Sequence, residues 1–242
     1  MATCLSDMIN DHSLDFLGLQ ETMKKDFSSK CLRRIDPFDI FQWTWIPSVG
    51  KSGGILCGVR SDKLEITACT KGKHILQLVL QDKQKKLKWL LVVYGPSHEE
   101  LKGEFLVELA ASCNGMQVPY IVGGDFNILR HAGEKNKKLN SHKSSDLFNS
   151  VNTVALREIH VNGGKYTWTN QQAHPTLEKL DCILMSEDWE DMFPLIHVRK
   201  LVCEISDHNP LLLSTGRRGE MPQNQESFVS IFPGSKTTDS YR

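Results

Sequence analysis

The spacing of apolar residues changes along the chain, and the change separates predicted helices from predicted strands. Leu5, Met8 and Ile9 recur at helical spacing, which predicts a short amphipathic helix ahead of the apolar stretch 16–19. Between residues 40 and 94 the apolar residues form strand-length runs instead, and these predict a sheet meander. The runs are FQWTWI, GGILCGV, LEITAC, HILQLVL and LKWLLVVYG.

The second half of the chain alternates between helical and strand patterns. Residues 98–114 have acids early and apolar residues on one face, which predicts a surface helix. PYIVGGDFN predicts a buried strand that ends in a glycine turn, and SSDLFNSVNTVALREI predicts a helix opened by a serine cap. The remaining predicted strands are YTWTN, LDCILMS, LIHVRKL and LLLS. This order indicates two layers of sheet flanked by helices.

Length and composition divide the chain into one domain and a tail. The 242 residues fit one large domain, which we place at 1–214. Residues 215–242 are rich in Gly, Pro, Gln, Ser and Thr and hold few apolar residues, so we expect a disordered tail there. The lysine-rich segment 81–86 is typical of an exposed hairpin tip, and this is favoured over a nucleic-acid patch.

Charge and cysteine usage bear on the partners and the cellular location of the protein. Lys+Arg and Asp+Glu are 29 each, so net charge gives no support for a polyanionic partner, and any nucleic-acid contact must be local. Seven cysteines without a CxxC pair disfavour a disulfide framework and a zinc site. The longest apolar run, 89–94, is far shorter than the roughly 20 residues that cross a bilayer. With no signal peptide in view, we expect a soluble nuclear or cytoplasmic protein.

Four motifs in a fixed order hold the candidate chemistry. Phosphodiester hydrolysis needs a metal that offsets phosphate charge, a nucleophilic water, and a group that stabilises the transition state. Mg²⁺ keeps several waters and takes only one or two protein carboxylates, so a sparse acidic set is sufficient. The motifs are LGLQET with Glu21, GGDFN with Asp125 and Asn127, KLD with Asp181, and SDHNP with Asp207 and His208.

Each motif alone has an ordinary structural explanation. Glu21 fits an exposed acid at a helix start, and GGDFN fits a turn whose Asp and Asn bond their own backbone. An Asp-His pair is usually an incidental surface dipeptide. If Asp181 instead fixes the His208 ring by hydrogen bonding, that support raises the histidine pKa.

Taken together with Tyr94 in VYGP and with YTW, the motif series resembles the endonuclease/exonuclease/phosphatase family in its motif order. Within that family it is most similar to the endonuclease domain of long interspersed (non-LTR) retrotransposons, particularly copies typical of plant genomes. The resemblance covers residues 5 to 214. It implies a four-layered α/β sandwich, in which two mixed β-sheets pack face to face with helices outside.

The resemblance also implies a metal and a water site. Glu21, helped by Asp207, would bind Mg²⁺ or Mn²⁺. Asp125 would orient or deprotonate the attacking water, and Asn127 would position that water or the phosphate. The implied partner is DNA, with no membrane and no small-molecule cofactor, and we expect a monomer.

The phosphate side of the implied site involves other residues. His208 would contact the scissile phosphate, oriented by Asp181, and Tyr94 would donate a further hydrogen bond. Thr167 and Trp168 fall where the family often contacts DNA, although an aromatic residue on a strand is more often part of a core.

Cations follow the GGDFN turn closely. Lys135, Lys137 and Lys138 are placed to track a phosphate backbone, although a solvated loop is favoured.

The chain departs from the family pattern at its start. Family members begin with an Asn-bearing strand in a WNxRG-like run, and Met1 enters at the helix that follows. We therefore expect an N-terminally truncated domain with its first strand missing and its core opened. The usual RLDR-like motif is KLDC here.

We hypothesise a metal-dependent DNA endonuclease of retrotransposon origin whose activity this loss impairs. A phosphatase or lipid phosphodiesterase on the same fold, or a non-catalytic remnant, stays open.

Overall fold

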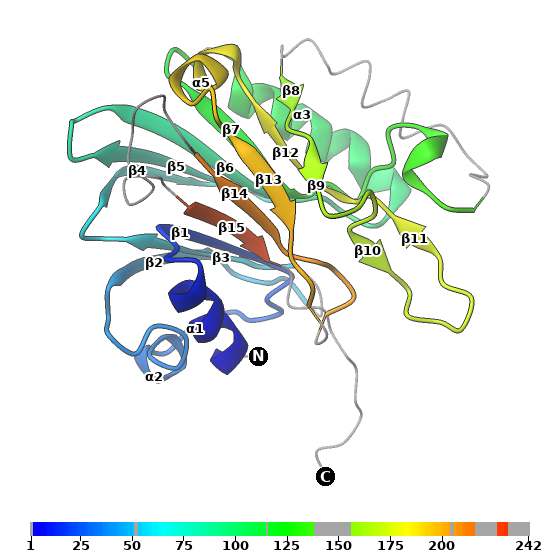
Figure 1. Cartoon of the computed structure of the whole chain (residues 1–242), viewed down its shortest axis with the longest axis horizontal. Helices are drawn as coiled ribbons and strands as arrows, with labels where there is room; N and C mark the ends of the chain where they lie inside the picture. The colour runs from blue at the N-terminus through cyan, green and yellow to red at the C-terminus, as the bar shows by residue number, and fades with distance from the viewer. Residues whose placement is uncertain are drawn as a thin grey trace.

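The chain folds around two β-sheets that pack face to face (Figure 1). The computed structural model describes residues 2–50, 53–114, 116–137, 156–203, 206–215 and 227–231. The helices are α1 (Ala2–Asp11), α2 (Ser29–Leu32), α3 (Lys102–Cys113) and α5 (Glu187–Met192), with short 3₁₀ turns η1 (Glu99–Leu101) and η2 (Ala132–Glu134).

The first sheet has seven strands in the order β2-β3-β1-β15-β14-β13-β9. Its interior pairings are antiparallel except for β1 with β15, and β13 also runs parallel to the edge strand β9. The strands are β1 (Phe16–Gln20), β2 (Phe41–Ile46), β3 (Ile55–Arg60), β9 (Val161–Asn162), β13 (His197–Lys200), β14 (Leu211–Ser214) and β15 (Ser227–Ile231).

The second sheet has six strands in the order β4-β5-β6-β7-β12-β8. Strands β4, β5 and β6 form an antiparallel meander, and α3 connects β6 to its parallel neighbour β7. A separate hairpin of β10 (Trp168–Thr169) and β11 (Leu177–Glu178) projects beside the sheets (Figure 1). The six strands are β4 (Leu64–Lys71), β5 (Ile75–Asp82), β6 (Leu87–Tyr94), β7 (Tyr120–Asp125), β8 (Arg157–Glu158) and β12 (Asp181–Met185).

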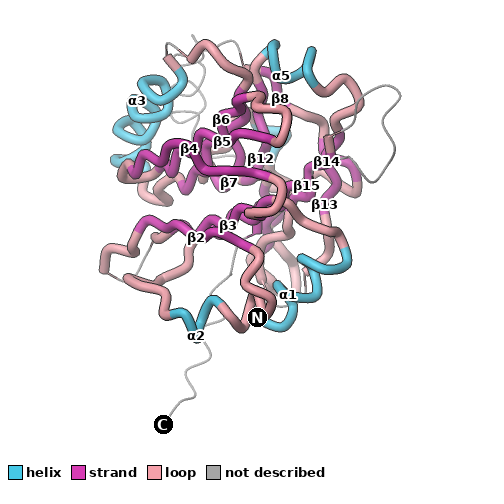
Figure 2. Tube along the Cα trace, turned by 90° about the vertical axis from the view of Figure 1, so that its left-hand side faces the viewer, coloured by secondary structure: helices cyan, strands magenta, loops and turns pink. Residues whose placement is uncertain are grey.

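Period-two alternation explains why the seven-stranded sheet is apolar on both faces. Successive side chains of a strand point to opposite faces, so Phe16 of β1 packs between the sheets while Leu17 packs outward. Leu5 and Ile9 of α1 cover that outer face, which confirms the amphipathic helix expected from their spacing. Figure 2 shows α1 and α2 on this side of the molecule.

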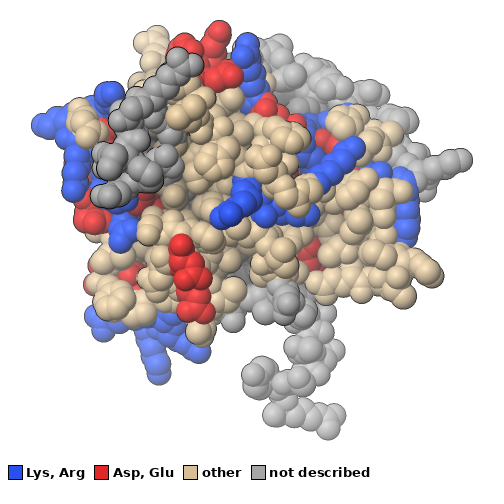
Figure 3. Space-filling view, viewed as in Figure 1, with Lys and Arg blue, Asp and Glu red and all other residues tan. Residues whose placement is uncertain are grey.

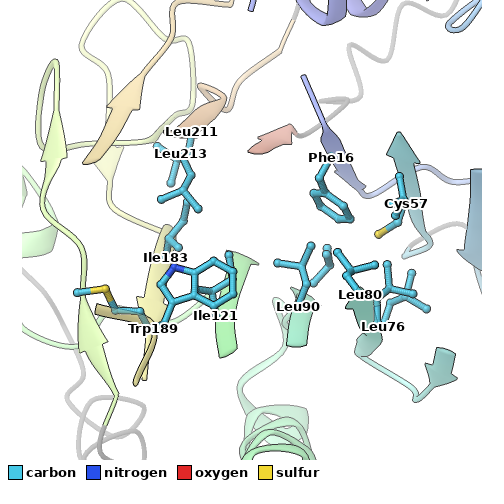
Figure 4. Close-up of a cluster of buried hydrophobic side chains, with 14 of the residues drawn as sticks. Phe16, Cys57, Leu76, Leu80, Leu90, Ile121, Ile183, Trp189, Leu211 and Leu213 are labelled. Atoms are coloured by element: carbon cyan, nitrogen blue, oxygen red, sulfur yellow. The ribbon is translucent and has the colours of Figure 1, made fainter. Parts of the chain in front are cut away.

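The six-stranded sheet repeats the same arrangement toward α3. Leu90 and Val92 of β6 face the other sheet, and Leu91 and Val93 pack with Phe105 of α3. Figure 4 shows the central layer, where side chains of the two sheets meet. The order helices, sheet, sheet, helix is the four-layered α/β sandwich that the sequence predicted (Figure 2).

Most predicted elements lie where the apolar pattern placed them. The surface helix of 98–114 is confirmed as η1 and α3, and 81–86 connects the antiparallel strands β5 and β6 as a hairpin tip. FQWTWI and GGILCGV are strands, but they pair within the seven-stranded sheet and not in the β4–β6 meander. The helix predicted for SSDLFNSVNTVALREI lies mostly outside the described residues.

Two expectations about the ends of the chain differ from the structure. Residues 227–231 of the expected disordered tail form β15, because two neighbouring strands supply hydrogen-bond partners for a segment too short to signal itself. The expected opening in the core is also absent among the described residues, since β1 has β3 on one side and β15 on the other. Among the described helices, none is long and apolar enough to span a membrane.

Candidate active site

Three polar residues lie in a row at the ends of three adjacent strands of the six-stranded sheet. Tyr94 ends β6 and is in register with Asp125, which ends the parallel strand β7. Asp125 is in turn in register with Asp181, the first residue of the antiparallel strand β12. Because in-register residues are direct neighbours in a sheet, the backbone ladder alone brings these side chains together.

A close backbone contact at Gly95 holds the end of this row. The Gly95 N–H donates to the carbonyl oxygen of Asp125 at 2.7 Å. A Cβ atom at residue 95 would lie 2.2 Å from the carbonyl oxygen of Phe126, a distance that no side chain tolerates. Glycine is therefore required where β6 turns away from β7.

Asp125 is buried and held by Asn127. The backbone N–H of Asn127 donates to Asp125 Oδ1 at 2.8 Å, and its side-chain Nδ2 donates to Oδ2 at 2.7 Å. Burial, followed by the negative charge of Asp181, raises the pKa of Asp125 well above its ordinary value, while the charge of His208 opposes this. A carboxylate with a raised pKa is a better proton acceptor than an exposed one.

Glu21 approaches the row from the seven-stranded sheet. It follows β1 with φ 51°, and the two residues after it donate backbone hydrogen bonds to the carbonyls of Gly54 and Gly53 at 3.2 and 3.0 Å. Burial raises the pKa of Glu21, the positive charge of His208 lowers it, and the charge of Asp207 raises it. The Tyr94 hydroxyl donates to the Glu21 carboxylate, so one hydrogen bond joins the two sheets here.

The loop that precedes β14 supplies a second carboxylate. Asp207 Oδ2 accepts a hydrogen bond from the indole Nε1 of Trp168 at 2.9 Å, and its carbonyl accepts from the Thr169 N–H at 3.0 Å. The other carboxylate oxygen, Asp207 Oδ1, is buried and has no hydrogen-bond partner among the described residues. A buried carboxylate oxygen without a hydrogen-bond partner favours the binding of a positively charged ligand.

His208 is bonded to Asp181 across the gap between the sheets. Its Nδ1 lies 2.9 Å from Asp181 Oδ2 and 3.3 Å from Oδ1, and both side chains are buried. Burial alone lowers the pKa of His208, but the charge and hydrogen bond of Asp181 outweigh it and raise the pKa to about 9. The imidazole is therefore positively charged at neutral pH, and the direction expected from the sequence holds.

Thr167 connects the β10–β11 hairpin to both halves of the site. Its Oγ1 accepts hydrogen bonds from the backbone N–H groups of Leu180 and Asp181, both at 3.1 Å. Its carbonyl accepts from the N–H of Asn209 at 2.8 Å. Thr167 is fully buried and presents no atom on the surface for DNA to contact. Trp168 is partly exposed, so a DNA contact there stays a prediction.

These groups surround one pocket of about 530 Å³. Asp181 and Thr167 do not line the pocket and support it from beneath. Six lining residues were not anticipated: Ser97, Glu99, Lys102, Leu129, Glu178 and Leu180. Ser97 follows VYGP directly and Glu178 precedes KLD, so proximity to those motifs was the available signal. The anticipated residues that line the pocket are Glu21, Tyr94, Asp125, Asn127, Trp168, Asp207 and His208.

Two of the three lysines that were expected to follow a phosphate backbone contact other residues of the protein. Lys135 Nζ forms an ion pair with Glu178 at 2.6 Å, and Lys137 Nζ donates to the carbonyl of His174 at 3.0 Å. Lys138 lies outside the described residues. A phosphate-tracking task for these lysines stays a prediction.

A profile of the endonuclease/exonuclease/phosphatase family matches residues 2–208. The chain belongs to this family. Family members are hydrolases, often nucleases, and they generally depend on divalent metals. A search of curated proteins gives no match.

Several solved structures share the fold at low sequence identity. The endonuclease domain of TRAS1, a telomere-specific non-LTR retrotransposon, has TM-score 0.66 at 15% identity and covers 90% of this chain and 93% of that one. An AP endonuclease from Archaeoglobus fulgidus has TM-score 0.68 at 14% identity, with 89% and 94% covered. D. rerio TDP2 complexed with a single-strand DNA product has TM-score 0.60 at 12% identity, with 86% and 88% covered.

The pocket residues fit a hard divalent cation with few protein ligands. No group of three or more His, Cys, Asp or Glu side chains in the described part of the chain is arranged to hold a metal ion. Glu21 and Asp207 line the same pocket, and the negative charge of Asp207 adds to burial in raising the pKa of Glu21. Two carboxylates, one with an unpartnered buried oxygen, match the needs of Mg²⁺, which keeps most of its waters.

Proposed function

We propose that this chain is a metal-dependent phosphodiester hydrolase that cuts one strand of DNA as an endonuclease. The observation that supports this most is the convergence of both sheets on one pocket. Glu21, Asp207 and His208 come from the seven-stranded sheet, and Asp125 and Asn127 come from the six-stranded sheet. Phosphodiester hydrolysis needs this combination of metal ligand, base and cation within one small space.

Glu21 and Asp207 are the proposed ligands of Mg²⁺ or Mn²⁺. When bound, the metal supplies charge neutralisation for the phosphate oxygens of the substrate. Trp168 donates a hydrogen bond to Asp207 Oδ2, so Asp207 Oδ1 is the oxygen proposed to bind the cation. The Tyr94 hydroxyl restrains Glu21 in the same way.

Asp125 is the proposed general base, and Asn127 positions it. Both hydrogens of Asn127 Nδ2 are used, one by Asp125 Oδ2 and one by the carbonyl of Gly95 at 2.9 Å. Only the side-chain oxygen of Asn127 remains for a further contact, and an oxygen accepts from water but not from a phosphate. Of the two tasks expected for Asn127, we therefore favour positioning the water.

His208 is the proposed electrostatic partner of the scissile phosphate. Its charged imidazole is held by Asp181 through Nδ1 and lines the pocket. Tyr94 lines the same pocket, and burial raises the pKa of its hydroxyl, so it stays a hydrogen-bond donor at any pH in use. Because Tyr94 donates its one proton to Glu21 in this structure, His208 is the group proposed to offset the negative charge that grows in the transition state, and a hydrogen bond from Tyr94 to the phosphate stays a prediction.

DNA is the proposed substrate, and the structural neighbours support this choice. TRAS1 contributes an endonuclease domain, and the D. rerio TDP2 structure holds a DNA product. The likeness to the TRAS1 domain also supports a retrotransposon origin. Positive and negative side chains are interspersed over the face shown in Figure 3, so we expect DNA to be held by local contacts around the pocket.

Nicking of supercoiled plasmid tests the proposal. We expect nicking with Mg²⁺, none with EDTA, and a loss of about 10²-fold or more in Asp207→Ala, because the metal then loses a ligand. The matched control is Asp7→Ala, which removes an exposed acid on α1 in the outer helical layer. Equal background nicking in wild type and Asp207→Ala would contradict the proposal. Turnover of a soluble phosphate ester without nicking would favour a phosphatase instead.

A further inference from the structure

The last described strand of the chain occupies an interior position in the seven-stranded sheet. Strand β15 lies between β1 and β14 (Figure 1). It pairs in parallel with β1, from Phe16 opposite Phe228 to Leu19 opposite Ile231. It pairs in antiparallel fashion with β14, where Leu211 is opposite Ser230. Residues 227–231 are beyond the segment 2–208 that matches the family profile.

Without β15 the sheet separates into two parts. One part is β2-β3-β1 and the other is β14-β13-β9, and no pairing joins β1 directly to β14. Glu21 follows the carboxyl end of β1, and Asp207 and His208 precede the amino end of β14. Gly18 and Leu211 are both opposite Ser230, so these two ends lie at the carboxyl end of β15, one on each side of it. Neighbouring strands are about 4.8 Å apart, so β15 holds β1 and β14 about 10 Å apart.

We propose that β15 is a positioning segment for the active site, which sets the span between Glu21 and the Asp207–His208 pair. The proposal deepens the proposed function, because it assigns the C-terminal strand a task in the same site. Its structural part, that β15 joins the two parts of the sheet, does not depend on the reaction.

A buried charge network anchors the start of β15. Asp15 precedes β1, is fully buried, and accepts a hydrogen bond through Oδ2 from the Ser227 N–H at 3.3 Å. Its own N–H donates to the Ser227 carbonyl at 2.8 Å. Lys63 Nζ lies 2.7 Å from Asp15 Oδ1, and Arg60 Nη1 lies 3.8 Å away. The anchor therefore ties β15 to both β1 and the end of β3.

The packing on either side of β15 also requires a strand between β1 and β14. Leu17 and Leu19 of β1 and Leu212 of β14 are buried in the outer core layer, so the backbone between them is shielded from water. If no strand lay between β1 and β14, the backbone N–H and C=O groups on their facing edges would have no hydrogen-bond partners, which folded proteins avoid. An extended segment of some kind must therefore lie between them.

The register favours the chain's own tail as the occupant over a second copy. Ser214 at the end of β14 is opposite Ser227 at the start of β15. The connection from 215 to 226 therefore begins and ends at neighbouring positions, as in a hairpin. Closing so short a span within one chain costs little entropy compared with recruiting another molecule.

Native-state hydrogen exchange on the full wild-type chain is the first test. We expect amides of 227–231 to exchange as slowly as those of β1 and β14, at every protein concentration. Exchange of 227–231 at free-chain rates, with β1 and β14 still protected, would overturn the proposal. Protection that falls on dilution would overturn the intramolecular pairing and indicate a strand from a second copy.

Two variants then test whether β15 positions the site. Val229→Pro removes an N–H from the centre of the strand, and Val229→Thr is the control that keeps the N–H and the β-branched shape. Asp15→Asn weakens the anchor at the start of β15 without changing a pocket residue. It is the test variant if Val229→Pro unfolds the whole chain. We expect Val229→Pro and Asp15→Asn to speed exchange in β1, β14 and β15 at least tenfold, with β6 and β7 unchanged.

The contact between His208 and Asp181 reports site geometry without any reaction. His208 Nδ1 lies 2.9 Å from Asp181 Oδ2 and the two residues come from different sheets, so a displaced β14 should separate them. We expect Val229→Pro to lose the NMR cross-peaks between the His208 ring and Asp181 and to lose at least tenfold in nicking. Unchanged cross-peaks and unchanged nicking in a variant whose β15 exchanges freely would overturn the proposal. If wild type does not nick DNA but the exchange and cross-peak results hold, the proposed function fails and the positioning of the site by β15 stands.

Discussion

The two halves of the site differ in how the chain places their residues. In the six-stranded sheet, Tyr94, Asp125 and Asp181 occupy neighbouring positions in one continuous ladder. In the seven-stranded sheet, Glu21 and the Asp207–His208 pair flank strands that a third strand separates. The first half is fixed by local pairing, whereas the second depends on a segment from the far end of the chain.

Several contacts between described residues join the two halves of the site. They include the His208–Asp181 pair, the Tyr94–Glu21 hydrogen bond, and the hairpin that contacts both sheets through Thr167. An active site divided in this way lets each half be perturbed while the other serves as a reference. Predictions that separate the halves are therefore informative, and they follow from the largest expected effect to the smallest.

The largest effect is expected at the centre of the six-stranded half. Asp125→Asn removes the proposed base and should lower kcat by about 10²–10⁴-fold, the usual contribution of general acid–base catalysis. Steady-state nicking rates measure this, with circular dichroism as a check on folding. Glu65→Gln, an exposed acid on the edge strand β4 of the same sheet, is the control. A loss shared by both variants, or by neither, would refute the assignment.

Breaking the pair between the halves should change the pH profile. Asp181→Asn removes the charge that raises the His208 pKa to about 9, so that pKa should fall toward its ordinary value of 6.5. A site that needs the charged imidazole then loses about 30-fold in kcat/KM at pH 8 and recovers much of it near pH 6. A uniform loss at every pH would contradict an electrostatic task for His208.

The same pair makes stability depend on pH. The pKa of His208 is higher in the folded state, so its contribution is complete below about 6.5 and is lost as pH rises through about 9. Urea denaturation of wild type across this range should show that loss, and Asp181→Asn should show a flatter dependence.

The tight turn of the six-stranded half should be sensitive to a single methyl group. Gly95→Ala places a Cβ against the Phe126 carbonyl and should lower the free energy of unfolding by about 1–3 kcal/mol. Gly123→Ala on β7 is the matched control. Its Cβ would meet only Ile183 at 3.5 Å, an ordinary contact, so we expect a change within about 0.5 kcal/mol. Equal effects in urea denaturation would show that the close approach at residue 95 relaxes readily.

The sequence predicted the first half of the site better than the second, for physical reasons. Strands β6, β7 and β12 contain strand-length apolar runs, and in β6 and β7 a polar residue beside Gly marks the end of the strand. The four-layered fold and the pocket-lining residues of the motifs follow from such patterns and from the family resemblance.

The structural features that the sequence did not predict share one cause, which is that they depend on tertiary contacts. Strand β15 has five residues within a polar segment, and pairing on both sides stabilises it more than its own composition does. Helix α5 was missed although Ser186 caps it by accepting from the Trp189 N–H. The burial of Thr167 was also missed, because sequence alone does not show that its hydroxyl faces the backbone of Leu180 and Asp181.

The smallest effect is expected at Trp168, whose indole orients a carboxylate of the seven-stranded half. Trp168→Phe removes the hydrogen bond to Asp207 Oδ2 but keeps an aromatic ring. Loss of such an outer partner typically weakens metal binding or activity 10–100-fold, and we expect about tenfold at this partly exposed position. The measurement is the Mg²⁺ concentration that gives half-maximal nicking.

A shift in this Mg²⁺ dependence distinguishes orientation of Asp207 from contact with DNA. If Trp168 acts through Asp207, saturating Mg²⁺ restores the rate of Trp168→Phe, because the metal then reorders its own ligand. If Trp168 contacts DNA, the loss persists at saturating Mg²⁺ and KM for DNA rises instead. Trp45→Phe, on β2 and packed against the outer core layer, controls for the general cost of replacing a partly buried indole. The Mg²⁺ titration therefore decides between the task that the sequence suggested for Trp168 and the one that its hydrogen bond supports.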